Sequence, residues 1–289
     1  MVITFIAAAL LGVFIGILSG LLGVGGGTIM VPMYRLAFGM SALASTATSL
    51  FTIIPTSISG VITHVRNKTC VPKLGIAMGL GGACTSPLGV WLASISPSWA
   101  VMVAAAIVIG YSAFNMVKKV LKAPRETPAP ASAPAPGEPT ASAPAPGETP
   151  APASADASAI SQSISSKQLV IGVLIGLVTG VASGYVGLGG GFLMVPLMLA
   201  WIGMPMKLAS GTSLIGIMLI AIPGAISQGL LGNIDYLAGI ATAIGTIPGA
   251  LVGARFVTRV PERTLRILFS IFLGIGAVLL VVKEVALFV

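Results

Sequence analysis

Charged side chains are rare in this chain of 289 residues. Asp, Glu, Lys and Arg together make up 8% of it, whereas hydrophobic residues make up 56% and the mean hydropathy is +1.05. Because soluble domains carry roughly a quarter charged residues, this composition excludes an ordinary soluble domain. We expect lipid to be the solvent for most of the chain.

Acidic residues are the scarcer charged type, with seven Asp and Glu against 15 Lys and Arg. None lies within a predicted membrane span: Asp235, Glu262 and Glu284 flank helix ends, and the other four lie in a central linker. A carboxylate proton relay or an acidic ring that selects cations therefore has no candidate residues. The basic residues lie at helix ends rather than on one soluble face, which favours membrane topology over nucleic-acid binding.

Residues for catalysis or metal binding are equally scarce. The chain has one histidine and two cysteines, Cys70 and Cys84, whose spacing predicts neither a metal site nor a disulfide framework. There is no GxxxxGK phosphate loop and no nucleophile with an ordered base. We therefore expect no enzyme activity, no metal and no cofactor.

Long apolar stretches dominate what is present. A membrane crossing needs roughly 20 apolar residues, and transmembrane strands would instead alternate over short runs, so the stretches predict helices. Eight long spans are expected, four in each half: Ile3–Gly20, Ala42–Ile62, Leu74–Ala93, Trp99–Val117, Leu169–Val186, Leu208–Leu231, Leu237–Phe256 and Ile267–Val282.

The apolar pattern stops between the two halves, where Pro, Ala, Ser, Gly and Glu replace it. Such a segment buries too little apolar surface to offset its ordering entropy, so it predicts a disordered cytoplasmic linker. The expected organisation is a first membrane repeat over residues 1–122, a linker over 123–168 and a second membrane repeat over 169–289.

The two halves share a glycine-rich motif. GILSGLLGVGGGTIMVPM, from Gly16 to Met33, returns as GLVTGVASGYVGLGGGFLMVPL from Gly176 to Leu197, so that Gly25 recurs as Gly189, 164 positions later. A duplicated apolar segment interrupted by glycine is the best sequence pointer to the binding site of a transporter.

A short apolar piece follows each triple glycine, over residues 28–39 and 192–203. As a helix each reaches only about 18 Å, short of a bilayer core of about 30 Å. If each piece completes a crossing together with its unwound glycine segment, 13 of the 15 basic residues lie on the side of the linker; otherwise nine do. Because Lys and Arg favour cytoplasmic loops, the first arrangement is preferred, and it predicts an inverted repeat with both termini outside.

The glycine runs predict an anion site. They break the helix, and the piece that restarts points unpaired N–H groups and the positive end of its dipole at the site. Hydroxyls that recur after the motif would add donors, although membrane hydroxyls often bind their own backbone instead. The candidate substrate-binding residues are Gly25, Gly26, Gly27, Thr28, Thr48, Ser49, Gly189, Gly190, Gly191, Thr212 and Ser213.

Three further residues are possible site residues. Arg35 lies inside a short apolar piece, from which it either reaches the outer surface or faces the anion path. His64, the sole histidine, lies near a helix end, where an interfacial position is expected, and Gln228 is its counterpart in the second half.

The paired motifs GLLGVGGGTIMVP and GYVGLGGGFLMVP, the TATSL and SGTSL echoes, and GARFVTRVPERTLRILF from Gly253 to Phe269 resemble the TauE/SafE family of sulfite exporter-like anion permeases. The resemblance covers both membrane halves; the linker departs from it. It implies a multi-pass carrier of the bacterial or archaeal inner membrane for sulfite, sulfonates or related anions, often in export.

These observations predict an all-helical, polytopic secondary transporter, with eight long spans and two short glycine-led helices. Its expected partners are a small anion and the lipid bilayer, and a homo-oligomer is possible. The alternative is a non-transporting membrane scaffold or assembly protein, in which the glycines serve only helix packing.

Overall fold

The computed structural model describes residues 2–122 and 165–288 and contains no strand in these ranges. Residues 123–164 of the predicted linker, 123–168, lie outside the described residues. The first helix after these residues begins at Ser166, where the Gln168 side chain accepts a hydrogen bond of 3.1 Å from the N–H of Ser165; the domain bounds stay a prediction. The helices are α1 (Val2–Leu22), α2 (Gly27–Ala37), α3 (Ala42–Arg66), α4 (Pro72–Ile95), α5 (Ser98–Lys122), α7 (Ser166–Val186), α8 (Gly191–Leu197), the π-helix η1 (Met198–Ile202), α9 (Met206–Leu230), α10 (Tyr236–Phe256) and α11 (Glu262–Phe288).

Seven of these helices are long and apolar enough to cross a membrane: α3, α4, α5, α7, α9, α10 and α11. This confirms an all-helical, multi-pass membrane protein. The remaining long span expected from the sequence, Ile3–Gly20, falls within α1, whose residues Ala7–Leu22 form a shorter apolar helix. The count of eight spans therefore stays a prediction at α1.

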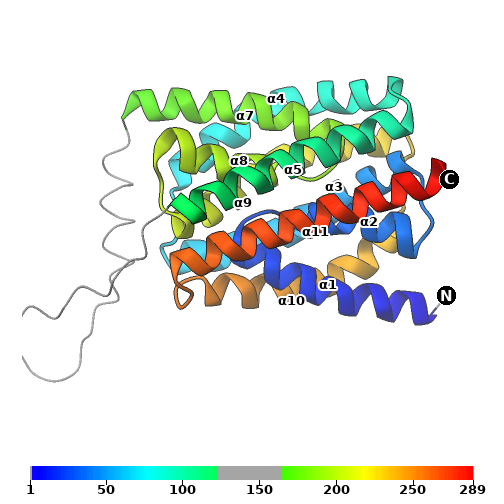
Figure 1. Ribbon diagram of the computed structural model, residues 1–289, viewed down its shortest axis with the longest axis horizontal. Coiled ribbons are helices and arrows are strands. Elements are labelled where there is room, and N and C mark those ends of the chain that lie inside the picture. Colours follow the sequence, from blue (N-terminus) through cyan, green and yellow to red (C-terminus); the bar gives the residue numbers. More distant parts are fainter. Residues whose placement is uncertain (1, 123–164, 289) are drawn as a thin grey trace, which may run out of the picture.

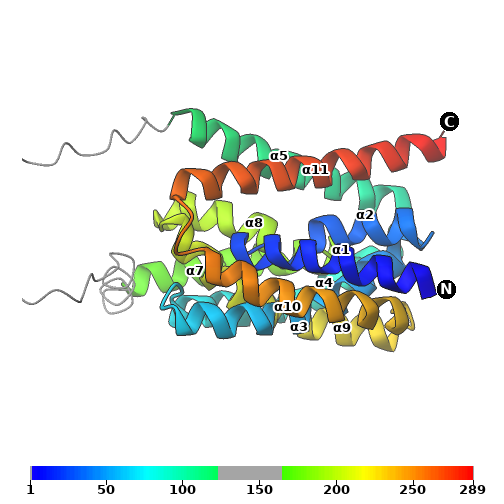
Figure 2. The same cartoon turned by 90° about the horizontal axis from the view of Figure 1, so that it is seen from below.

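The long helices lie side by side in one bundle, with the start of α1 and the end of α11 at one end (the terminal end) and the end of α5 and the start of α7 at the other (the linker end) (Figures 1 and 2). α1 starts at the terminal end, whereas its counterpart α7 starts at the linker end (Figure 1). α2 turns back from inside the bundle toward the terminal end, and α8 turns back toward the linker end (Figure 2). α1 and α7 thus start at opposite ends of the bundle, and α2 and α8 turn back in opposite directions.

Each half supplies the packing partner for the first helix of the other. α1 packs on α10 and α7 packs on α4. Glycines allow these contacts: a Cβ added to Gly20 would lie 2.2 Å from the carbonyl oxygen of Ala250, and one added to Gly184 would lie 2.0 Å from that of Ser86. Close approach through small residues is the usual way in which membrane helices associate.

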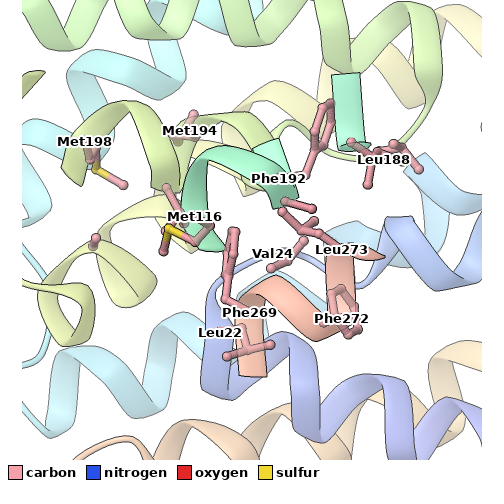
Figure 3. Packing of buried hydrophobic residues seen from close by; sticks show 14 of the residues in the cluster. Leu22, Val24, Met116, Leu188, Phe192, Met194, Met198, Phe269, Phe272 and Leu273 are labelled. Atoms are coloured by element: carbon pink, nitrogen blue, oxygen red, sulfur yellow. The ribbon is translucent and has the colours of Figure 1, made fainter. Parts of the chain in front are cut away.

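The short helices are held inside the bundle by two apolar layers. On one side, Val24 and Leu188 of the connecting loops pack with Phe192, Phe272 and Leu273 (Figure 3). On the other side, α3 packs on α2 and α9 packs on α8, and α3 and α9 pack on one another. The starts of α2 and α8 therefore lie between the α5/α11 pair and the α3/α9 pair.

Candidate functional site

The helix breaks at the two triple glycines arise from backbone conformation. Gly25 and Gly26 have φ of +80° and +82°, and Gly189 and Gly190 both have φ of +78°. A side chain in this left-handed region costs roughly 1–2 kcal/mol, so glycine is favoured at these positions. The repeated glycines therefore allow α1 and α7 to end and α2 and α8 to restart within the bundle.

The two glycine loops touch one another. A Cβ added to Gly27 would lie 2.6 Å from the carbonyl oxygen of Leu188, and one added to Gly191 would lie 2.7 Å from that of Val24. Six positions predicted as site residues are thus brought together from opposite halves of the chain: Gly25, Gly26, Gly27, Gly189, Gly190 and Gly191. All six are buried.

Two equivalent isoleucines cover the loops from the α3/α9 side. A Cβ added to Gly25 would lie 3.4 Å from Ile53 and 3.1 Å from Ile217. One added to Gly189 would lie 2.9 Å from Ile53 and 3.2 Å from Ile217. Both isoleucines are fully buried. The loops are therefore enclosed by apolar side chains at this face.

Backbone donors are left over at both loops. In the part of the chain that the structure describes, none of the six glycine N–H groups donates a hydrogen bond, and neither Gly26 nor Gly190 provides a side-chain cap. Buried backbone N–H groups without partners are rare in proteins. Because the N-terminal end of a helix is also the positive end of its dipole, this arrangement attracts negative charge.

Unpartnered hydroxyls lie beside these donors. The Cβ of Ser19 lies 3.6 Å from a Cβ added to Gly26, and the Cβ of Ser183 lies 3.4 Å from one added to Gly190. Both serines are fully buried, and neither hydroxyl has a hydrogen-bond partner in the described chain. Sequence reasoning did not select them as site residues, although their recurrence within the duplicated motif was a visible signal.

The predicted hydroxyl residues divide into two groups. The hydroxyls of Thr28 and Ser49 are fully buried and have no hydrogen-bond partner among the described residues. Thr212 accepts from the N–H of Val71 at 2.9 Å, and Thr48 accepts from the N–H of Asp235 at 3.0 Å.

These two threonines fix the starts of α4 and α10. Ser213 donates to the carbonyl oxygen of Gly23 at 2.7 Å, which ties α9 to the glycine loop of the other half. The structure therefore gives Thr48, Thr212 and Ser213 contacts that position the loops.

A strip of hydroxyls between α2, α3 and α10 is present in only one arrangement of the repeat and has no equivalent in the other. Tyr34 and Thr52 share a hydrogen bond of 2.9 Å, and Thr56 and Thr246 share one of 2.6 Å. Thr242 also belongs to this strip, which is fully buried. The equivalent positions in the other half carry no hydroxyl: Met198, Gly216, Ile220, Met78 and Gly82.

The three possible site residues lie in the last turns of their helices, Arg35 in α2, His64 in α3 and Gln228 in α9. Arg35 occupies the last turn of α2, about 12 Å along the helix from Gly27 at 1.5 Å per residue, and is 7% exposed. His64 is fully buried, and its Nε2 and Nδ1 lie 2.8 Å from the carbonyl oxygen of Gly20 and from the Thr69 hydroxyl. A neutral ring that donates from Nε2 and accepts at Nδ1 satisfies both contacts. His64 therefore donates to a carbonyl oxygen in the last turn of α1.

Gln228 matches His64 only in part. Its Oε1 accepts from the Asn233 side chain at 2.8 Å, as Thr69 pairs with His64 in the first half. Its buried Nε2 has no partner among the described residues. In that same part of the chain, no group of three or more His, Cys, Asp and Glu residues could hold a metal ion.

Known proteins are similar in sequence to this chain along nearly its whole length. A family model described as Sulfite exporter TauE/SafE matches residues 8–280. The chain is 26% identical to the probable membrane transporter protein YunE of Bacillus subtilis (strain 168), over 93% of this chain and 94% of that protein. The probable membrane transporter protein YdhB of the same organism is 25% identical, over 87% and 90%.

An archaeal relative is also similar. The probable membrane transporter protein MJ0441 of Methanocaldococcus jannaschii is 24% identical, over 92% of this chain and 91% of that protein. No solved structure matches the chain significantly.

Proposed function

Because the chain belongs to the TauE/SafE family of membrane transporters, we propose that it is a secondary carrier that exports small sulfur-containing anions, such as sulfite and sulfonates, across the inner membrane. The observation that carries this proposal is the meeting of two uncapped, glycine-led helix starts inside the bundle. Such starts are a general device for binding anions, and broken helices at a repeat interface are a general feature of secondary transporters.

In the proposed site, one anion is bound between the starts of α2 and α8. The free N–H groups of the glycine loops donate to its oxygens, and the hydroxyls of Ser19 and Ser183 donate from either side. The loops carry no acidic side chains, and a buried carboxylate there would repel an anion. This supports an anion rather than a cation as the ligand. Sulfite and sulfonates carry several oxygens in one small group, which suits donors that converge from two helices.

The proposed topology is an inverted repeat with both termini outside and the linker inside. It is supported by the opposite directions of α1 and α7 and by the basic residues at the linker end of the bundle. Lys and Arg prefer cytoplasmic loops. Single cysteines introduced at Arg259 and Ser96 should be labelled from opposite sides of the membrane, and labelling from the same side would contradict this topology.

Export needs no fuel beyond the membrane potential. A potential of 100 mV is worth about 2.3 kcal/mol per charge. This corresponds to roughly a fortyfold outward gradient of a monovalent anion, because 1.4 kcal/mol is about tenfold. Alternating access would expose the anion to one end of the bundle at a time, and this requires Ile53 and Ile217 to move away from the glycine loops.

The test is flux of labelled sulfite in proteoliposomes with an imposed potassium diffusion potential. We expect efflux that rises when the inside is negative and that sulfoacetate or thiosulfate inhibits by competition. Replacing Gly26 or Gly190 by valine should abolish flux in protein that still elutes as a folded species in detergent. If folded wild-type protein carries no anion under any potential, the alternative of a non-transporting scaffold, in which the glycines serve packing, is favoured.

A further inference from the structure

A basic pocket opens where α10 ends, away from the glycine loops. It has a volume of about 540 Å³ and is lined by Asn67, Val252, Arg255, Phe256, Thr258 and Arg259. None of these residues belongs to the proposed anion site. α10 ends at the same end of the bundle at which α5 ends and α7 begins (Figure 2).

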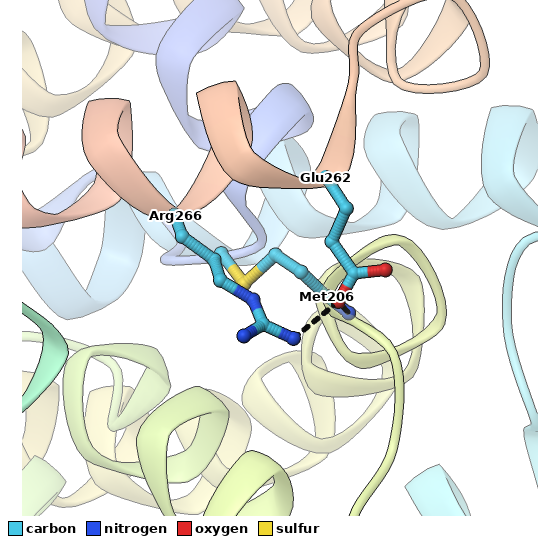
Figure 4. Close-up of polar contacts among 3 residues, drawn as sticks. All are labelled: Met206, Glu262 and Arg266. Carbon is cyan, nitrogen blue, oxygen red and sulfur yellow. Dashed lines mark hydrogen bonds and ion pairs between the residues drawn. The ribbon is translucent and has the colours of Figure 1, made fainter. Parts of the chain in front are cut away.

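The two arginines of the pocket have no carboxylate partner among the described residues. Glu262, the acidic residue nearest in sequence, accepts from the N–H of Met206 at 3.1 Å and pairs with Arg266 (Figure 4). Asp235 lies at the opposite end of α10, where it caps the helix. The pocket therefore holds positive charge that the described part of the chain does not neutralise.

The end of a helix normally disfavours an anion, because its last carbonyl groups carry the negative end of the dipole. Here several carbonyl oxygens at and just beyond the end of α10 already accept hydrogen bonds. Ala254 accepts from Asn67 at 3.3 Å, Phe256 accepts from two backbone N–H groups beyond it, and Thr258 accepts from Lys207 at 3.2 Å. These bonds partly offset the negative end of the helix dipole beside the two arginines.

One wall of the pocket is apolar and faces outward. Val252 and Phe256 are one helical turn apart on α10, and they are 39% and 46% exposed. In a membrane protein this exposed apolar surface meets lipid. The guanidinium of Arg259 lies over the Phe256 ring, 5.7 Å from its centroid, so charge and apolar wall are adjacent.

We propose that this pocket binds an anionic phospholipid, whose phosphate contacts Arg255 and Arg259 and whose acyl chain lies along Val252 and Phe256. A free inorganic anion would use the arginines but has no use for the apolar wall. Basic pockets between transmembrane helices are a general mode of binding anionic lipid headgroups. The proposal does not depend on transport, and its test uses no flux measurement.

The test compares lipid binding by the wild type and by the double variant Arg255→Gln/Arg259→Gln in nanodiscs. Native mass spectrometry counts bound phosphatidylglycerol, and thermal unfolding measures stabilisation when phosphatidylglycerol replaces part of the phosphatidylcholine. We expect the double variant to bind phosphatidylglycerol about thirtyfold more weakly, since each arginine near a membrane surface contributes roughly fivefold.

Arg263→Gln is the matched control, because Arg263 is an exposed arginine near the same end of the bundle that does not line the pocket. It should retain at least half of the stabilisation by phosphatidylglycerol. Equal losses in Arg263→Gln and the double variant would overturn the proposal, because they would indicate general surface charge.

A second arm separates lipid from free anion. Wild-type protein in pure phosphatidylcholine nanodiscs is titrated with inorganic phosphate and with sulfite. No stabilisation that depends on Arg255 and Arg259 is expected. If either soluble anion stabilises the wild type but not the double variant, the pocket is a site for a free anion and the lipid assignment is wrong.

Discussion

Replacing Ser19 and Ser183 by alanine should raise the stability of the protein and impair its function. Both hydroxyls are buried beside the glycine loops and have no hydrogen-bond partner in the part of the chain that the structure describes. An unsatisfied buried polar group costs about 1–3 kcal/mol, and each substitution removes that cost while deleting a single oxygen atom. We therefore expect Ser19→Ala and Ser183→Ala each to be at least as stable as the wild type, by up to about 1–3 kcal/mol.

The effect on anion binding has the opposite sign. A hydrogen bond to a charged group contributes about 1.5–3 kcal/mol, which corresponds to roughly a 10- to 150-fold loss of affinity when the donor is removed. Flux of labelled sulfite at low concentration should fall by at least the lower factor. Thermal unfolding in detergent without anion gives the stability, and proteoliposome flux gives the function.

Ser213→Ala is the control, because the Ser213 hydroxyl is bound to the carbonyl oxygen of Gly23. This variant should lose about 1 kcal/mol of stability, the usual net value of one hydrogen bond. Two results would refute the reasoning. If Ser19→Ala and Ser183→Ala are destabilised as much as Ser213→Ala, their hydroxyls have partners in the protein; if flux is unchanged, they do not bind the anion.

Three further predictions follow from the backbone, the hydroxyl strip and the loop cysteine. Gly26→Ala and Gly39→Ala introduce the same left-handed strain of about 1–2 kcal/mol, because φ is +82° and +63°. Only Gly26→Ala should reduce sulfite flux, since a Cβ at Gly39 meets nothing within 4 Å; equal loss in both would indicate strain alone. A double-mutant cycle of Thr56→Val and Thr246→Val in thermal unfolding should give a coupling of about 0.6 and at most about 1.7 kcal/mol, and zero coupling would contradict their hydrogen bond of 2.6 Å. Burial raises the pKa of Cys70, in the loop before α4, to about 11, so at pH 8 on the order of one thiol in a thousand is ionised. In a variant that lacks the other cysteine, maleimide labelling should accelerate about tenfold per pH unit between pH 8 and 9.5, whereas labelling at pH 8 as fast as in the unfolded protein would refute the burial.

The sequence predicts the helices well, because lipid imposes apolar composition and length on each of them. The stretch Leu237–Phe256 differs by one residue from α10, and Ala42–Ile62 falls short of α3 by one turn. The glycines also predict the helix breaks, because a φ near +80° is a local backbone conformation that glycine adopts without a steric cost. By contrast, nothing in the sequence marks the π-helix over Met198–Ile202.

The partners of the hydroxyls could not be predicted in the same way. Thr48 and Thr212 occupy equivalent places in the repeat and suggest ligand donors, yet each accepts from a backbone N–H more than 100 residues away. The Ser19 hydroxyl has no hydrogen-bond partner within residues 2–122 and 165–288. Whether a hydroxyl is used or free depends on which distant loop reaches it, and that is decided by tertiary packing alone.

The exchange of helices between the halves also governs how the protein is made. α1 leaves the ribosome long before α10, the helix that covers its glycine face. At roughly 5–20 residues per second, the stretch from Leu22 to Phe256 takes about 10–50 s to synthesise. During that interval the face of α1 is covered only by lipid or by the insertion machinery. Assembly is therefore a late event in biogenesis, and two half-chains produced separately should recover the native bundle only when both are present in the same membrane.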